Sequence, residues 1–116
     1  DLHSFPTRRS SDLEPGPWIV TADEIANPHD LDLKCWVNGE LRQSSNTSEM
    51  IANIFAQIAY LSTACTLEPG DIIGTGTPEG VGLGMHPPCW LKVGDIVRCE
   101  VENIGHIEHR IVAPSD

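Results

Sequence analysis

The sequence predicts an α+β fold that is mainly β, with two hairpins and one amphipathic helix. Two segments, 31–37 and 96–102, alternate between apolar and polar residues, as half-buried strands do. A third segment repeats its apolar residues at helical spacing from Ile51 to Leu61. We therefore expect a small sheet made of short strands and supported by a single helix.

Asn38-Gly39 marks the first hairpin, because both central positions of a type I′ turn need positive φ and these residue types tolerate it. The strand before it places its apolar residues on one side: Leu31, Leu33, Cys35 and Val37. Residues 40–43 are expected to form the return strand. Trp36 falls on the polar side, where it either covers a partner or makes an ordinary edge contact.

The second hairpin is predicted near the C-terminus, where 96–102 is followed by a turn at 103–105 and a return strand at 107–112. Two further short strands are predicted at Trp18–Thr21 and Asp71–Ile73. The segments LEPGDII and LKVGDIV share the same order of Gly, Asp and apolar residues. We interpret this as the reuse of one turn and not as an internal repeat.

The helix is predicted over Ser48–Thr63. Asn46 or Thr47 can cap it, and Glu49 stands three residues after Asn46, as in a capping box. Its apolar residues form a stripe that we expect to lie in the core: Ile51, Ile54, Phe55, Ile58 and Leu61.

The segment from Leu67 to Gly84 holds six of the ten glycines of the chain. After Ile73, glycines alternate with Thr75 and Thr77 up to Pro78, so backbone is exposed beside two hydroxyls. This pattern is typical of a loop that approaches a ligand closely, although a plain connection that turns a corner is the alternative. A phosphate cradle is not favoured, because no Lys-Ser or Lys-Thr follows and the GxGxxG order is not met.

Titratable side chains give weaker signals. Glu79 lies in the glycine loop and is the best acid/base candidate by position, with a solvated carboxylate as the alternative. Glu100 and Glu102 have E-x-E spacing, which we interpret as a solvated strand face. The histidines lie in expected loops or, three residues apart, on opposite faces of a strand: His29, His86, His106 and His109. The cysteines form no CxxC pair and are expected to be reduced and mostly buried: Cys35, Cys65, Cys89 and Cys99.

The formal net charge is −10, which disfavours binding to nucleic acid or to an anionic membrane. No apolar run is long enough to cross a bilayer. Residues 1–13, DLHSFPTRRSSDL, look like a common short-read sequencing adapter translated in frame, and we exclude them from fold reasoning. A natural leader segment is the alternative interpretation.

Three blocks of the sequence resemble, in the same order, the C-terminal part of the fumarylacetoacetate hydrolase family. They are WVNGELRQSSNTSEMI, TLEPGDIIGTGTPEGVG and PPCWLKVGDIVRCEVENIGHIEHRIV. The resemblance covers most of the chain from Gly16 to Val112. It implies an incomplete β-rich roll in which residues 14–116 form the C-terminal portion of a fumarylacetoacetase-like catalytic domain. It also implies that the helix packs beside the sheet and helps to position the loop at Thr77.

Members of this family are metal-dependent enzymes that hydrolyse, decarboxylate or isomerise β-diketo and 2-oxo acids. The resemblance implies that Thr77 contacts substrate and that Gly76 beside it belongs to the same substrate site. The family's catalytic residues and its ligands for Mg²⁺, or for Mn²⁺ or Ca²⁺, are expected upstream, so no catalytic or metal residue is assigned in this chain. The parent is expected to be a cytoplasmic homodimer acting on a small oxo acid, and this chain to be inactive alone. A non-catalytic small-molecule-binding or dimerisation module on the same scaffold is the alternative.

Overall fold

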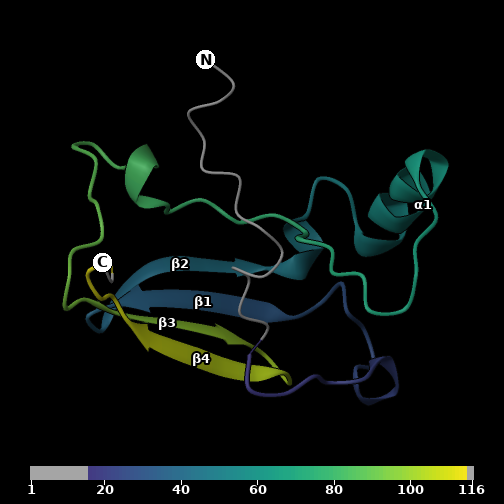
Figure 1. Cartoon of the computed structure of the whole chain (residues 1–116), viewed down its shortest axis with the longest axis horizontal. Helices are drawn as coiled ribbons and strands as arrows, with labels where there is room; N and C mark the ends of the chain where they lie inside the picture. Colours follow the sequence, from purple (N-terminus) through teal and green to yellow (C-terminus); the bar gives the residue numbers. More distant parts are fainter. Residues whose placement is uncertain (1–15, 115–116) are drawn as a thin grey trace.

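The computed structural model contains a four-stranded antiparallel sheet in the order β2-β1-β3-β4 (Figure 1). The structure describes residues 16–114. Its elements in chain order are η2 (Ala22–Glu24), β1 (Asp32–Val37), β2 (Glu40–Asn46), η3 (Thr47–Glu49), α1 (Ile54–Ala64), η4 (Gly82–Gly84), β3 (Ile96–Val101) and β4 (Gly105–Arg110). The predicted class, α+β and mainly β with two hairpins and one helix, is confirmed. The adapter-like residues 1–13 lie outside the described part.

Asn38 and Gly39 form the first hairpin turn, as predicted, with φ angles of 52° and 80°. β2 continues to Asn46, beyond the predicted end at Gln43, because its polar residues still pair along β1. Strand pairing uses backbone groups, so a polar side chain facing solvent does not end a ladder. Between Cys35 and Trp36 the register shifts, which leaves Arg42 as the extra residue of a β-bulge.

The second hairpin joins β3 to β4 through a turn in which Asn103 has a φ of 60°. Ile104 donates its backbone N–H to the carbonyl of Val101 at 3.1 Å, which closes the turn. β4 therefore starts at Gly105 and ends at Arg110, whereas the sequence predicted a return strand over 107–112. The chain turns back sooner than expected because Gly105 already pairs with Val101.

The two similar segments LEPGDII and LKVGDIV do contain the same turn. Gly70 and Gly94 have φ angles of 96° and 95°. The side chain of Asp71 accepts a hydrogen bond from the backbone N–H of Glu68, and Asp95 does the same with Lys92, each at 2.8 Å. The prediction that one turn is used twice is confirmed.

Two predicted strands are wrong. Trp18–Thr21 and Asp71–Ile73 pair with no strand in the part of the chain that the structure describes. Both have apolar strand-forming residues, but a strand exists only where a neighbour supplies the ladder. Trp18 instead lies against Gly105 and donates its indole N–H to the carbonyl of Ile104 at 2.7 Å.

The helix begins later than predicted. Asn46 caps only the short turn η3, accepting from the N–H of Ser48 at 2.9 Å. Met50 then leaves helical geometry with a ψ of 129°, and Asn53 caps α1 by accepting from Ala56 at 2.8 Å. The prediction of one helix over Ser48–Thr63 is therefore corrected to η3 followed by α1, because two Asn caps compete within eight residues.

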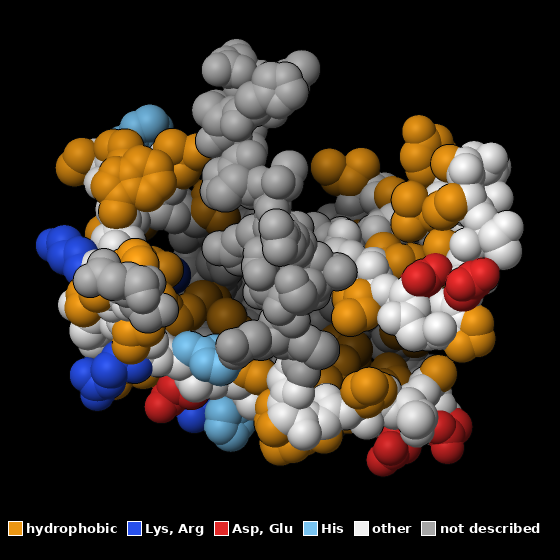
Figure 2. Space-filling model, in the orientation of Figure 1, with side chains coloured by type: hydrophobic (Ala, Val, Ile, Leu, Met, Phe, Trp, Pro, Cys, Tyr) orange, Lys and Arg blue, Asp and Glu red, His pale blue; other side chains and the backbone are white. Residues whose placement is uncertain are grey.

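Apolar side chains are largely uncovered. Among residues 16–114 only the hydrophobic side chain of Leu31 is buried, with 5% exposure. The expectation that the helix stripe lies in the core is wrong, because α1 has no buried residue and Phe55 is 66% exposed. Figure 2 shows apolar side chains gathered over this helix. The helix thus carries an exposed apolar surface.

Candidate functional site

The glycine-rich loop leaves its backbone open to solvent at Gly74–Thr77. Beyond chain neighbours, no described heavy atom lies within 4 Å of the place where a Cβ would stand at Gly74 or Gly76. Gly76 has a φ of 115°, in the region that favours glycine. Thr75 and Thr77 are exposed. The open backbone and the two hydroxyls are as the sequence predicted for a loop that a ligand can approach.

Two glutamine side chains hold this loop in place. Gln43, in β2, donates its side-chain amide to the hydroxyl of Thr77 at 3.0 Å. Gln57, in α1, donates to the carbonyls of Ala52 and Thr75, at 2.8 Å and 3.3 Å. The helix therefore does contact the loop two residues before Thr77, although its apolar stripe stays uncovered.

Beyond Thr77 the loop packs against backbone that only glycine can approach. A Cβ on Gly80 would overlap the carbonyl oxygen of Arg42 at the bulge of β2, and Gly80 has a φ of 100°. A Cβ on Gly82 would overlap the carbonyl oxygen of Cys89, which in turn donates its N–H to the carbonyl of Gly82 at 2.9 Å. Close packing thus fixes the loop on the downstream side of its open part.

Arg42 extends from the bulge to the segment after the loop. Its guanidinium lies 2.9 Å from the sulfur of Met85 and 3.6 Å from that of Cys89. Its Nε lies 3.5 Å from the carboxylate of Glu40. Consecutive residues of β2 therefore reach different parts of the glycine-rich segment, with Gln43 on its open part and Arg42 farther along.

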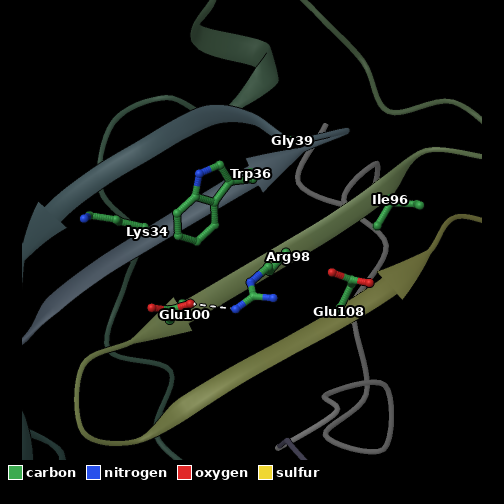
Figure 3. Close-up of a pocket in the computed structure, with 7 residues that line it drawn as sticks. All are labelled: Lys34, Trp36, Gly39, Ile96, Arg98, Glu100 and Glu108. Carbon is green, nitrogen blue, oxygen red and sulfur yellow. Dashed lines mark hydrogen bonds and ion pairs between the residues drawn. The ribbon is translucent and has the colours of Figure 1, made fainter.

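Both glutamates of the E-x-E pair make hydrogen bonds with nearby residues. Glu100 pairs with Arg98 at 2.9 Å on a face of the sheet that also carries Trp36 (Figure 3). The hydrogen bond from Arg98 holds the pKa of Glu100 below its ordinary value. Glu102 accepts from the backbone N–H of Asp32 at 3.1 Å. The interpretation as a strand face holds for Glu100 in β3, whereas Glu102 lies in the turn just after that strand.

Trp36 lines a hollow of this face with charged residues from three strands, Lys34, Arg98, Glu100 and Glu108 (Figure 3). The guanidinium carbon of Arg98 lies 6.0 Å from the centre of the Trp36 ring. That distance is at the outer limit of a cation–π interaction. The indole therefore contacts a neighbouring strand of the sheet, and β1 is an inner strand and not an edge.

The histidines play separate parts. His29 accepts a hydrogen bond at Nε2 from the N–H of Ile54, the first residue of α1, at 3.1 Å. Its ring also meets that of Phe55 edge to face, with centroids 4.8 Å apart. His106 pairs across the sheet with Glu100 and His109 with Val97, so the two lie on opposite faces, as predicted. His86 is exposed.

The four cysteines are free thiols. The expectation that they are mostly buried is wrong, because Cys65 and Cys89 are exposed and the other two are half-buried. Cys35 and Cys99 face each other across β1 and β3, with 3.5 Å between their sulfurs. Burial, followed by the hydrogen bond with Cys99, raises the pKa of Cys35 to about 11.

A metal site needs several donor side chains that converge on one point. Within residues 16–114, no group of three or more His, Cys, Asp or Glu side chains is placed to hold a metal ion. The residues of the described part therefore do not fit the metal that the family resemblance implies.

The structure supports Gly76 and Thr77 as an exposed pair in the loop, and it adds Gln43, which the sequence reasoning did not single out. Gln43 stands in the first of the three resembling blocks, next to Arg42. Its place in the predicted return strand identifies it only as a polar residue. The first loop residue it contacts, Thr77, is 34 residues later. Glu79 offers its backbone carbonyl to Gln43 at 3.3 Å, and its acid/base role stays a prediction.

The geometry defines a small antiparallel sheet that carries an open, threonine-bearing loop. The family model for the fumarylacetoacetate hydrolase C-terminal domain matches residues 11–112. The chain therefore belongs to the fumarylacetoacetate hydrolase family.

Named relatives agree with this assignment. The mitochondrial oxaloacetate tautomerase fahd2 of Xenopus laevis is 50% identical over 97 residues, which are 84% of this chain and 30% of that protein. The fumarylacetoacetate hydrolase of Exiguobacterium antarcticum has a similar structure, with a TM-score of 0.82, 44% identity, and coverage of 85% of this chain and 35% of that one.

A maleylpyruvate hydrolase from Sphingobium sp. SYK-6, solved with manganese (II) ion and pyruvate, is also similar. Its TM-score is 0.76 at 45% identity, over 84% of this chain and 34% of that one. The chain thus spans about a third of the length of the relatives it matches. These proteins act on oxo acids, as their names state.

Proposed function

We propose that this chain is the C-terminal part of a divalent-metal-dependent enzyme acting on 2-oxo or β-diketo acids. The reaction is C–C bond hydrolysis, decarboxylation or keto–enol isomerisation. The open loop at Gly76-Thr77 carries the proposal, because it presents a hydroxyl and uncrowded backbone in a chain that is about half identical to oxo-acid enzymes. Of the three reactions we favour keto–enol isomerisation of oxaloacetate, in view of the Xenopus laevis relative.

Within this reaction the loop binds and orients the substrate. The Thr77 hydroxyl and loop N–H groups can fix a carboxylate or carbonyl oxygen, which restricts the substrate to a reactive geometry. The metal and its ligands are assigned outside residues 16–114, since no suitable cluster exists among them. Of Mg²⁺, Mn²⁺ and Ca²⁺, the manganese-bound relative favours testing Mn²⁺ beside Mg²⁺.

The uncovered apolar surface supports the proposal that the chain functions within a longer protein and an oligomer. Ile51, Tyr60 and Ile19 are 108%, 75% and 85% exposed. Large apolar side chains that are exposed together over one region are typical of an interface, and Figure 2 shows such side chains gathered over α1. We propose that upstream residues of the parent protein and a second subunit of a homodimer cover it.

The location of the protein stays a prediction. None of the helices among residues 16–114 has the length and apolar character needed to span a bilayer. We keep the cytoplasm as the expected compartment, and a mitochondrial location is the alternative suggested by the names of several relatives.

The test uses the completed protein, meaning this chain expressed together with its upstream coding sequence recovered from the source DNA. Its turnover of enol-oxaloacetate, an acylpyruvate and a hydroxymuconate-type diacid would be measured with Mg²⁺ or Mn²⁺, with and without chelator. Thr77→Ala should lower kcat/KM by a factor on the order of 10² if the hydroxyl contacts the reacting part of the substrate. Thr75→Ala, a matched loss of an exposed hydroxyl in the same loop, should keep most activity.

The outcomes separate the rival functions. Chelator-sensitive turnover that depends on Thr77 supports the enzyme and identifies the reaction. If no substrate class is turned over with either metal, the enzyme proposal fails. Small-molecule binding that is indifferent to chelator would then favour the non-catalytic binding module.

A further inference from the structure

The amide of Gln43 meets the glycine loop at three successive residues. Its Nε2 lies 3.0 Å from the hydroxyl oxygen of Thr77, 2.9 Å from the carbonyl oxygen of Pro78 and 3.3 Å from that of Glu79. Carbonyl oxygens only accept hydrogen bonds, so the nitrogen of the amide, and not its oxygen, faces the loop. Towards Thr77, Gln43 therefore acts as a donor.

This contact determines what the Thr77 hydroxyl can do. A hydroxyl has one hydrogen to donate and two lone pairs to accept with. Since Gln43 donates to the oxygen, the hydrogen of Thr77 is directed elsewhere. Thr77 is exposed, and Gly76 beside it has open space where a side chain would stand. The hydrogen is thus available to an acceptor outside the protein.

The bulge in β2 makes this arrangement possible. With Arg42 as the extra residue, Gln43 stays paired with Cys35, on the face of the sheet that the loop covers. Gly80, without a Cβ, packs directly on the carbonyl of Arg42. The loop therefore lies close enough to β2 for a single amide to span Thr77, Pro78 and Glu79.

We propose that Gln43 is a positioning residue that makes Thr77 a hydrogen-bond donor to an anionic oxygen of the substrate. The oxygen is a carboxylate or enolate oxygen, because these accept strongly and do not donate. This inference rests on the proposed function, in that the ligand is taken to be an oxo acid. Gln43 itself need not touch the substrate.

The decisive substitution is Gln43→Glu in the completed protein. The introduced carboxylate accepts hydrogen bonds, so it draws the Thr77 hydrogen towards itself and removes it from the ligand. We expect kcat/KM for oxaloacetate to fall by a factor on the order of 10², with partial recovery at acid pH where the introduced carboxyl is protonated and can donate. Gln43→Leu frees the Thr77 hydroxyl to rotate and also removes the contacts with the carbonyls of Pro78 and Glu79, and it should lower kcat/KM about tenfold.

A double-substitution cycle separates positioning from general support of the loop. In a Thr77→Val background no hydroxyl remains to be oriented, so Gln43→Glu should cost little more. Gln57→Leu is the matched control, because Gln57 holds the Thr75 carbonyl without contacting Thr77. The decrease in kcat/KM caused by Gln57→Leu should add to the decrease caused by Thr77→Val, and kcat/KM should not recover at acid pH.

Binding of oxalate, a dianion that should not be turned over, provides a measurement independent of activity. Calorimetry on the same variants should show that Gln43→Glu binds oxalate more weakly than the wild type. The losses of binding free energy from Gln43→Glu and Thr77→Val should again not be additive. Turnover in the wild type together with wild-type kcat/KM in Gln43→Glu overturns the inference while the proposed function stands. If the wild type has no turnover, the proposed function fails and oxalate decides: non-additive weakening supports the role of Gln43, whereas unchanged affinity or no binding overturns it.

Discussion

The side-chain amide of Asn38 donates to the carboxylate of Asp95 at 2.9 Å. This contact ties the turn of the first hairpin to the turn that precedes β3, far along the chain. Asn38 also accepts from the backbone N–H of Ile96 at 2.9 Å, and Asp95 from that of Lys92 at 2.8 Å. Two residues therefore connect both hairpins at one end of the sheet.

The charge of Asp95 should matter for stability. The amide of Asn38, and then the N–H of Lys92, hold the pKa of Asp95 below its ordinary 3.8. Because the pKa is lowered by folding, this stabilisation is present above pH 3.8 and is lost as pH falls through the lower folded value. Asp95→Asn should lower the urea midpoint of the completed protein at neutral pH.

Urea denaturation at several pH values checks this prediction. The difference between wild type and Asp95→Asn should shrink in acid, where the carboxylate is neutralised in both states. Asp71→Asn serves as the control, because Asp71 makes the same turn contact with Glu68 but, within the described residues, has no counterpart of Asn38. An equal loss in both variants would argue against the link between the hairpins.

Gly80 and Gly74 should respond very differently to alanine. Gly80 has a φ of 100° and its added Cβ would overlap the carbonyl of Arg42, which is backbone and cannot rotate away. Gly80→Ala should lower the free energy of unfolding by about 1–3 kcal/mol and displace the loop. Gly74→Ala, where space is open, should stay within about 0.5 kcal/mol of wild type. Thermal unfolding of both variants compares them directly, and equal stability would contradict the close packing of the loop on β2.

Cys35 should react slowly with alkylating agents. Its pKa is raised to about 11 from an ordinary 9.0, chiefly by burial and then by the hydrogen bond with Cys99. The thiolate is the nucleophile, so the labelling rate should climb with pH towards that raised value. The raised folded pKa also means that the neutral thiol stabilises the fold below pH 9.0 and that this contribution is lost as pH rises through about 11.

Cys99→Ala provides the control for Cys35, because it removes the hydrogen bond and leaves the surrounding strands. The midpoint of the labelling profile of Cys35, followed by mass spectrometry, should shift downward in this variant. A wild-type midpoint near 9.0 would show that neither burial nor Cys99 acts on this thiol.

The apolar surface predicts different behaviour for the 116-residue chain and the completed protein. Ile51 is fully exposed and Ile19 is 85% exposed. The short chain should bind an apolar dye strongly and self-associate, whereas the completed protein should bind little dye because the surface is covered. Ile51→Ser with Ile19→Ser should reduce dye binding by the short chain. Equal, low binding by both proteins would contradict the proposal that upstream residues or a partner cover this surface.

Local patterns predicted several elements correctly. Asn38-Gly39 specified its hairpin because positive φ is a property of those two residues, and the repeated Gly-Asp turn was readable for the same reason. The family resemblance was carried by residues in sequence order. Thr77 and Gly76 could thus be singled out before any fold was known, and their contact with substrate stays a prediction.

Errors arose where an element depends on its neighbours. Trp18–Thr21 and Asp71–Ile73 have strand-like composition but no ladder partner in the described chain. The helix start moved to Ile54 because Asn53 competed successfully with Asn46 as a cap. The helix stripe stayed exposed, because periodicity shows which side is apolar and not whether anything covers it.

The sequence by itself determined the turns, the first hairpin, the family and the exposed glycine–threonine loop, because each depends on residues close together in the chain. Only the tertiary structure decided that Gln43 donates to Thr77 and that Gly80 rests on Arg42. Those contacts join β2 to a loop beyond the helix. The physical reason is that they depend on a one-residue bulge and on strand register, which backbone pairing sets and which no local preference of these residues encodes.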